Sequence, residues 1–122
     1  MSTERYTQEA LTIEVADNAD TVHVRWLGKS TARDPAKFIL PVLTRALERS
    51  RYRASPMVLD FQEVEYLNSS TITPIIRILH QAARGASEVT VLYKKDLKWQ
   101  ALSFTALEVF HTESSRIVVR GM

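Results

Sequence analysis

Apolar and polar residues alternate in two short stretches near the start of the chain. Residues 11–15 read Leu-Thr-Ile-Glu-Val, and residues 22–26 read Val-His-Val-Arg-Trp. A period of two is typical of half-buried strands. Asp and Asn residues at 17–20 suit the turn between them. The pattern therefore predicts a β-hairpin at the start of the domain.

Helical periodicity follows in three longer stretches. Asp34 predicts an N-cap and Pro35 the first residue of a helix whose apolar face continues to about Arg49. A second helix is predicted over residues 70–84, where apolar residues recur at i, i+3, i+4 and i+7. A third begins at residue 96 or 97 and continues through residue 107.

Unbroken apolar runs predict further strands at residues 57–61, 89–92 and 117–119. The predicted order is β-β-α-β-α-β-α-β. This order indicates an α/β fold with a small four- to five-stranded mixed sheet and about three helices, mostly on one side. Polar residues 1–9 are expected to form a mobile N-terminal arm, and residues 10–122 a single domain.

Composition excludes several classes of function. The 45% hydrophobic and 25% charged residues are ordinary for a soluble globular protein, and no apolar run is long enough to span a membrane. Sixteen Lys and Arg against fourteen Asp and Glu give a net charge of only +2, and the charges are interspersed, which disfavours nucleic-acid binding. The chain has no cysteine, and its polar first nine residues are not expected to be a signal peptide. These features predict a cytoplasmic protein without a membrane or nucleic-acid partner.

An enzyme is also disfavoured. Asp60, Ser69 and His80 suggest a hydrolase triad, but Ser69 and His80 are eleven residues apart along the second helical stretch, which separates them by roughly 16 Å. A nucleophile and its base must lie within hydrogen-bond distance. His23 and His111 are in no recognised catalytic context, and neither a metal-ligand cluster nor a glycine-rich phosphate loop is present. We therefore expect no catalysis, no metal and no cofactor.

The most informative segment is Asn68-Ser69-Ser70-Thr71, between the strand at 57–61 and the second helix. One interpretation is a capping cluster worth about 1 kcal/mol to the helix. The other is a phosphorylation site, because helix N–H groups favour an anion there. Pro74 would remove a hydrogen bond from a helix that began at Asn68. We therefore predict Thr71 as the cap, with Ser69 just outside the helix and accessible to a kinase.

The same segment resembles a known family. Val-Leu-Asp-Phe at residues 58–61, followed by Leu-Asn-Ser-Ser-Thr-Ile at residues 67–72, is similar to the STAS domain of anti-sigma factor antagonists. That family carries an Asp-Ser-[Ser/Thr]-Gly-Leu motif, whose Ser is phosphorylated by a partner kinase. The resemblance places Ser69 on the phosphoacceptor, with Ser70 as second choice. It also implies a bacterial, non-enzymatic switch that binds an anti-sigma factor or Ser kinase.

Two residues depart from that motif. Asn68 replaces its Asp and Thr71 replaces its Gly. Asn before the hydroxyl resembles the SiaC-type branch of regulatory phosphoproteins, as do Gly-Lys-Ser at 28–30, Phe38 and Pro41. That branch controls a diguanylate cyclase, together with a kinase and a phosphatase.

The resemblance implies a partner-binding surface formed by Gly28, Lys29, Ser30, Asn68, Ser69, Ser70, Thr71, Thr73 and Arg77. An alternative hypothesis is a STAS scaffold or small-ligand sensory module that acts without phosphorylation.

Overall fold

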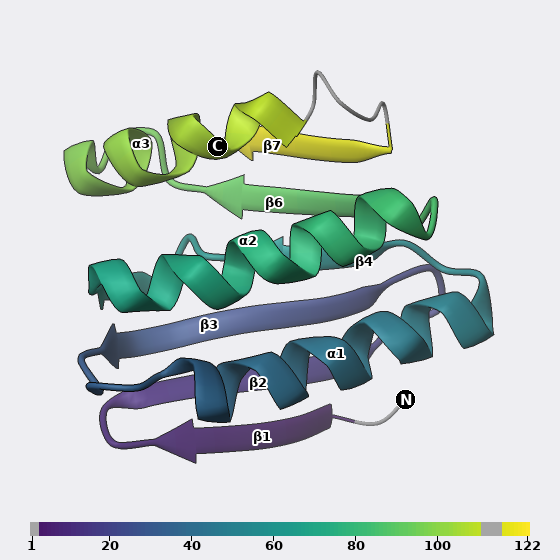
Figure 1. The fold of residues 1–122 in the computed structure, drawn as a ribbon, viewed down its shortest axis with the longest axis horizontal. Coiled ribbons are helices and arrows are strands. Elements are labelled where there is room, and N and C mark those ends of the chain that lie inside the picture. Colours follow the sequence, from purple (N-terminus) through teal and green to yellow (C-terminus); the bar gives the residue numbers. More distant parts are fainter. Residues whose placement is uncertain (1–2, 111–115) are drawn as a thin grey trace.

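One mixed β-sheet forms a layer of the protein, and the helices lie across one of its faces (Figure 1). The computed structural model describes residues 3–110 and 116–122. In chain order the elements are β1 (Thr3–Gln8), β2 (Leu11–Asp17), β3 (Val22–Ser30), α1 (Ala36–Arg53), β4 (Met57–Asp60), β5 (Val64–Leu67), α2 (Ser69–Arg84), β6 (Val89–Tyr93), α3 (Lys98–Thr105), a 3-10 turn (Ala106–Glu108) and β7 (Ile117–Gly121). The predicted α/β class, three helices and mixed sheet are confirmed.

Strands β1, β2 and β3 form the antiparallel part of the sheet, and β3, β4, β6 and β7 form the parallel part. The predicted hairpin is the pair β2–β3, with Ile13 opposite Trp26. Helices α1, α2 and α3 are crossovers between parallel strands, which explains why they gather on one face (Figure 1). No helix in the described part of the chain is long and apolar enough to cross a bilayer.

The sheet has seven strands rather than four or five. The prediction of a mobile arm over residues 1–9 is wrong for Thr3–Gln8, which pairs along its whole length with β2. This edge strand contains little apolar surface, so the hydrophobic pattern of the sequence does not predict it. Contacts to α1 hold it instead: Glu4 forms an ion pair with Arg49, and the hydroxyl of Tyr6 accepts a hydrogen bond from Arg45 at 3.3 Å.

The other additional strand, β5, pairs with the end of β3 beyond Gly28 and carries the chain to α2. It is four residues long, and its Val64 and Leu67 are buried on the core side. Because only two of its residues are apolar and buried, the sequence pattern reads as a loop. Strand β5 matters for the site because it delivers Asn68 beside the end of β3.

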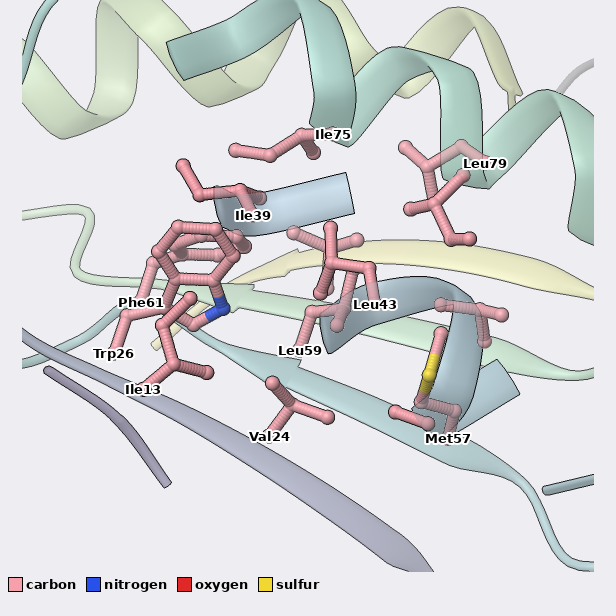
Figure 2. Packing of buried hydrophobic residues seen from close by; sticks show 14 of the residues in the cluster. Ile13, Val24, Trp26, Ile39, Leu43, Met57, Leu59, Phe61, Ile75 and Leu79 are labelled. Atoms are coloured by element: carbon pink, nitrogen blue, oxygen red, sulfur yellow. The ribbon is translucent and has the colours of Figure 1, made fainter. Parts of the chain in front are cut away.

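The core lies between the sheet and the helices. Figure 2 shows Ile13, Val24 and Trp26 on the strands facing Ile39 of α1 and Ile75 of α2. Trp26, Phe61 and Phe104 are the largest fully buried side chains, and their rings pack in a row, with centroids 4.7 and 4.6 Å apart. Burying a large apolar side chain contributes about 1.5–3 kcal/mol. This row fixes the end of the sheet where β4 gives way to β5.

The start of α1 differs slightly from its prediction. Pro35 occupies the N-cap position with helical backbone angles and no side-chain cap, and Ala36 is the first helical residue. Asp34 is therefore not the N-cap, although its carboxylate lies 3.7 Å from the ammonium of Lys37. Pro41 lies inside the helix, which continues beyond the predicted Arg49 to Arg53.

Candidate functional site

The Asn68–Thr71 segment lies at the carboxyl end of the parallel strands, where β5 leads into α2. In Figure 1 the start of α2 and the arrowhead of β3 are at the same end of the sheet. The backbone N–H of Asn68 donates to the carbonyl of Ser30 at the end of β3, at 3.0 Å. The two segments that the sequence analysis assigned to the partner-binding surface are therefore neighbours.

Asn68 joins three segments through its side chain. Its Oδ1 accepts hydrogen bonds from the backbone N–H of Thr71 at 3.1 Å and from the Thr71 hydroxyl at 2.6 Å. Its Nδ2 donates to the carbonyl of Ala32, in the loop between β3 and α1, at 2.9 Å. This last bond requires an amide, because a carboxylate has no hydrogen to donate to a carbonyl. The geometry thus gives Asn at this position a role that Asp cannot fill.

The hydroxyls of Ser30 and Thr71 lie 2.6 Å apart and are both buried. The single hydroxyl hydrogen of Thr71 is directed to Asn68 Oδ1. The hydroxyl of Ser30 must therefore donate to Thr71 Oγ1. The result is a buried chain of hydrogen bonds that couples the end of β3 to the first turn of α2.

The predicted cap of α2 is wrong. Asn68 is the N-cap, Ser69 is the first helical residue, and Thr71 lies inside the first turn. Pro74 also lies inside the helix and leaves the carbonyl of Ser70 without an intrahelical donor. Ser70 is exposed, so water can satisfy that carbonyl. The cost of Pro74 is therefore small, and the cap formed by Asn68 decides where the helix begins.

The predicted site residues fall into an exposed group, a buried group, and the half-buried Gly28 and Asn68. Ser69, Ser70, Thr73 and Arg77 are exposed along α2, and Lys29 is exposed at the end of β3. Ser69, Thr73 and Arg77 are four residues apart and form one stripe on the helix.

Ser30 and Thr71 form the buried group, so their side chains are not available for direct contact with a partner in this structure. Their hydrogen bonds position the exposed residues instead. Gly28 has a φ of +85°, and a Cβ there would lie 2.1 Å from the carbonyl oxygen of Ala10. This close approach requires glycine. Gly28 therefore shapes the bend in β3 that precedes Lys29.

The start of α2 is suited to an added anion. The first turn contains no acidic residue, and the N–H groups of a helix N-terminus favour negative charge. Among the described residues, neither the Ser69 nor the Ser70 hydroxyl has a hydrogen-bond partner. A phosphoryl group on either hydroxyl would meet no carboxylate in that turn.

The structure pairs Asp60 with His23, a pair that the sequence analysis did not identify. His23 Nε2 lies 3.1 Å from Asp60 Oδ2, and Gln62 donates to Oδ1 through its backbone and its side chain. Burial raises the pKa of the Asp60 carboxyl, but these hydrogen bonds more than offset it and hold the pKa below its ordinary value. His23 alternates with core residues of β3, so the pair lies on the sheet face away from the helices. The alternation of His23 with apolar residues in the sequence could have indicated that its side chain lies on this face.

The remaining candidates for chemistry lie elsewhere. His80 is exposed on α2 and packs edge-on against the ring of Phe110, at 4.9 Å between centroids. His111 lies outside the described residues. Within residues 3–110 and 116–122, no three His, Asp or Glu side chains come together as a metal site.

By sequence, no model of a known family and no curated protein matches this chain. By structure, the solved proteins that resemble this chain include the following two. An anti-sigma factor antagonist from Mycobacterium paratuberculosis has a TM-score of 0.64 at 16% identity, with 84% of each chain covered. SiaC of Pseudomonas aeruginosa has a TM-score of 0.63 at 19% identity, with 100% of each chain covered. The resemblance seen in the Asn68–Thr71 segment is therefore confirmed for the fold, which this chain shares with an anti-sigma factor antagonist and with SiaC.

Proposed function

We propose that this protein is a non-enzymatic protein-binding switch controlled by phosphorylation of Ser69. The observation that carries the proposal is the position of Ser69, an exposed hydroxyl on the first residue of α2, directly after a rigid N-cap. Asn68 and Thr71 hold the backbone on both sides of it. A kinase would thus find an accessible hydroxyl in a defined geometry.

Ser69 is the first choice of phosphoacceptor and Ser70 the second. Both are exposed, whereas the hydroxyl of Thr71 is buried and already hydrogen-bonded on two sides. A phosphoryl group adds close to two negative charges, which the helix N-terminus stabilises. Phosphorylation would therefore leave the fold intact and change the charge of the surface around it.

The exposed residues around Ser69 would form the partner-binding surface. Lys29, Ser70, Thr73 and Arg77 would contact the partner, while the hydrogen bonds of Asn68 keep the β3–α1 loop next to α2. The new charge would weaken a complex that formed on the unmodified surface. The fold shared with an anti-sigma factor antagonist supports a partner of the anti-sigma factor or Ser kinase class, in a bacterial cytoplasm.

A second candidate partner is a diguanylate cyclase that acts with a kinase and a phosphatase. The Asn68 network favours it, because the bond to Ala32 gives Asn a structural reason in the place of the antagonist motif's Asp. The SiaC structure also covers the full length of this chain. In either case the chain would act as a regulator and not as a catalyst.

Binding measurements on two variants would test the switch. Ser69→Ala removes the acceptor and is expected to bind the partner as tightly as the unmodified protein, measured by calorimetry. Ser69→Asp is expected to weaken binding, and Thr105→Asp, on α3 away from this surface, serves as the control. If both Ser69 variants bind like the wild type, the switch is excluded. Ligand-dependent thermal stabilisation without phosphate incorporation would favour a sensory module instead.

A further inference from the structure

A shallow groove lies on the outer surface of α1, along residues 36–48, and reaches α2 at Arg77. Its volume is about 580 Å³. The groove contains apolar surface from Leu40 and Pro41, three cations at Lys37, Arg45 and Arg77, and one carboxylate at Glu48. Leu43 of α1 and Ile75 of α2 belong to the buried core and do not line the groove. The groove is therefore a surface feature left over after the core has formed.

The groove offers apolar contact at its surface. Pro41 is exposed there and has no N–H, so the carbonyl of Lys37, one turn earlier, lacks its intrahelical donor. Leu40 is half-buried beside it. A proline on the exposed face of a helix thus supplies a rigid apolar ring.

The charge of the groove is not balanced from within the protein. In the described part of the chain, Arg77 has no carboxylate partner, and Arg45 is hydrogen-bonded only to the neutral hydroxyl of Tyr6. The 3.7 Å pair of Lys37 with Asp34 is largely exposed to solvent and so is weak. An occupant that carries carboxylates at its edges would compensate these cations.

We propose that the groove binds an acidic amphipathic helix of the protein partner. The apolar face of that helix would lie on Leu40 and Pro41, and its flanking Glu or Asp side chains would pair with Arg45 and Arg77. Helix-in-groove binding of this kind uses apolar anchors at i, i+3, i+4 and i+7. This proposal rests on the proposed function, because it identifies the type of partner element that the switch controls.

The groove reaches α2 at Arg77, which lies on the same stripe of the helix as Ser69. Ser69, Thr73 and Arg77 occupy one stripe, and eight residues of helix place Ser69 about 12 Å from Arg77. That distance exceeds the Debye length of about 8 Å at physiological salt. A phosphoryl group on Ser69 would therefore repel the acidic end of the bound helix that reaches it, and not the whole of it. The complex would be weakened by a local clash of like charges.

A peptide probe would test the groove directly. We suggest a stapled helical peptide of about 20 residues with Leu on one face and Glu at its flanks, and a second peptide with Lys in place of every Glu. Fluorescence anisotropy should show binding of the acidic peptide, with the basic peptide at least about tenfold weaker. Amide chemical shifts should move along α1 and α2 and leave the opposite face of the sheet unchanged.

Two charge reversals on the same helix provide matched variants. Arg77→Glu should weaken binding of the acidic peptide at least about tenfold. Arg84→Glu, equally exposed but outside the groove, should change it less than twofold. The proposed binding site would be contradicted if both peptides bound equally or if both variants had equal effects. Chemical-shift changes confined to another face would also contradict it. The peptide-binding proposal and the phosphorylation proposal can be contradicted independently. The peptide assay does not require phosphate, and Ser69 phosphorylation does not require the peptide.

Discussion

Asn68 and Thr71 are joined by two hydrogen bonds to one oxygen atom: Asn68 Oδ1 accepts from the backbone N–H of Thr71 at 3.1 Å and from its hydroxyl at 2.6 Å. The Nδ2 group of Asn68 donates a hydrogen bond to the carbonyl of Ala32. One side chain therefore sets where α2 begins and how close the β3–α1 loop lies to it. The exposed hydroxyl of Ser69 owes its fixed position to this arrangement.

Replacing Asn68 by Asp should destabilise the protein by about 1 kcal/mol at pH 7. The carboxylate loses the hydrogen bond to the Ala32 carbonyl and faces its oxygen, which costs about 1–3 kcal/mol. The negative charge of the Asp cap at the helix N-terminus offsets about 0.3–1 kcal/mol of this loss. Urea unfolding would measure the difference. Below the pKa of the new carboxyl its O–H can donate to Ala32, so the deficit should shrink at acid pH; an unchanged free energy of unfolding at pH 7 would contradict the role of the donor.

Ser30 and Thr71 should show energetic coupling. Thr71→Val keeps the shape of the side chain but leaves the Ser30 hydroxyl without its acceptor, at a cost of about 1–3 kcal/mol. Ser30→Ala should cost a similar amount, and the double variant less than the sum, by about 0.5–3 kcal/mol. A double-mutant cycle in urea measures this coupling. Thr73→Val, exposed on the same helix, should stay within about 0.5 kcal/mol, and strict additivity would exclude the network.

Gly28→Ala should destabilise the protein more than Gly121→Ala. At Gly28 the added Cβ meets the carbonyl oxygen of Ala10 at 2.1 Å, and the φ of +85° adds strain of about 1–3 kcal/mol. At Gly121 the nearest atoms are side-chain atoms of Tyr93 and Lys95, at 2.9 and 3.0 Å, which have more freedom to move. Thermal unfolding of both variants would compare them. An equal loss of stability in the two variants would show that the backbone at Gly28 does not specifically require glycine.

The Asp60–His23 pair should make stability depend on pH in the acid range. Because the folded-state pKa of Asp60 is lowered, the folded protein binds this proton more weakly than the unfolded chain does. The contribution of Asp60 is therefore present above its ordinary pKa of about 3.9 and is lost as the pH falls through the folded value. Asp60→Asn should flatten the fall in stability below about pH 4. Identical slopes for the variant and the wild type would contradict the pair's contribution.

Much of the fold could be predicted because its main elements have strong apolar patterns. The hairpin strands carry a period of two, helices α1 and α2 carry apolar faces with the helical period, and the central strands are short apolar runs. The edge strand Thr3–Gln8 could not be predicted in this way, since ion pairs and main-chain bonds hold it. The predicted N-cap of α2 is three residues too late, because the prediction excluded a proline from the helix interior. The helix instead begins after Asn68 and contains Pro74.

The location of the site was predictable, but its internal connections were not. The hydroxyl cluster at residues 68–71 marks the start of a helix by its composition alone. The contacts of Asn68 with Ala32, and of Ser30 with Thr71, join residues that lie 36 and 41 positions apart. Only the folded sheet brings them together. The division into exposed and buried hydroxyls therefore required the structure.

The account depends most directly on whether Ser69 carries phosphate in the cell. Intact-mass measurement of the protein from its native cell, followed by peptide mapping, would answer this. The account predicts a fraction of molecules with one added phosphate on Ser69, which disappears in Ser69→Ala and persists in Thr73→Ala, an exposed hydroxyl one turn away. A phosphate mapped only to Ser70 would move the switch by one residue. Complete absence of phosphate from residues 68–71, with the cognate kinase present and active, would contradict the account.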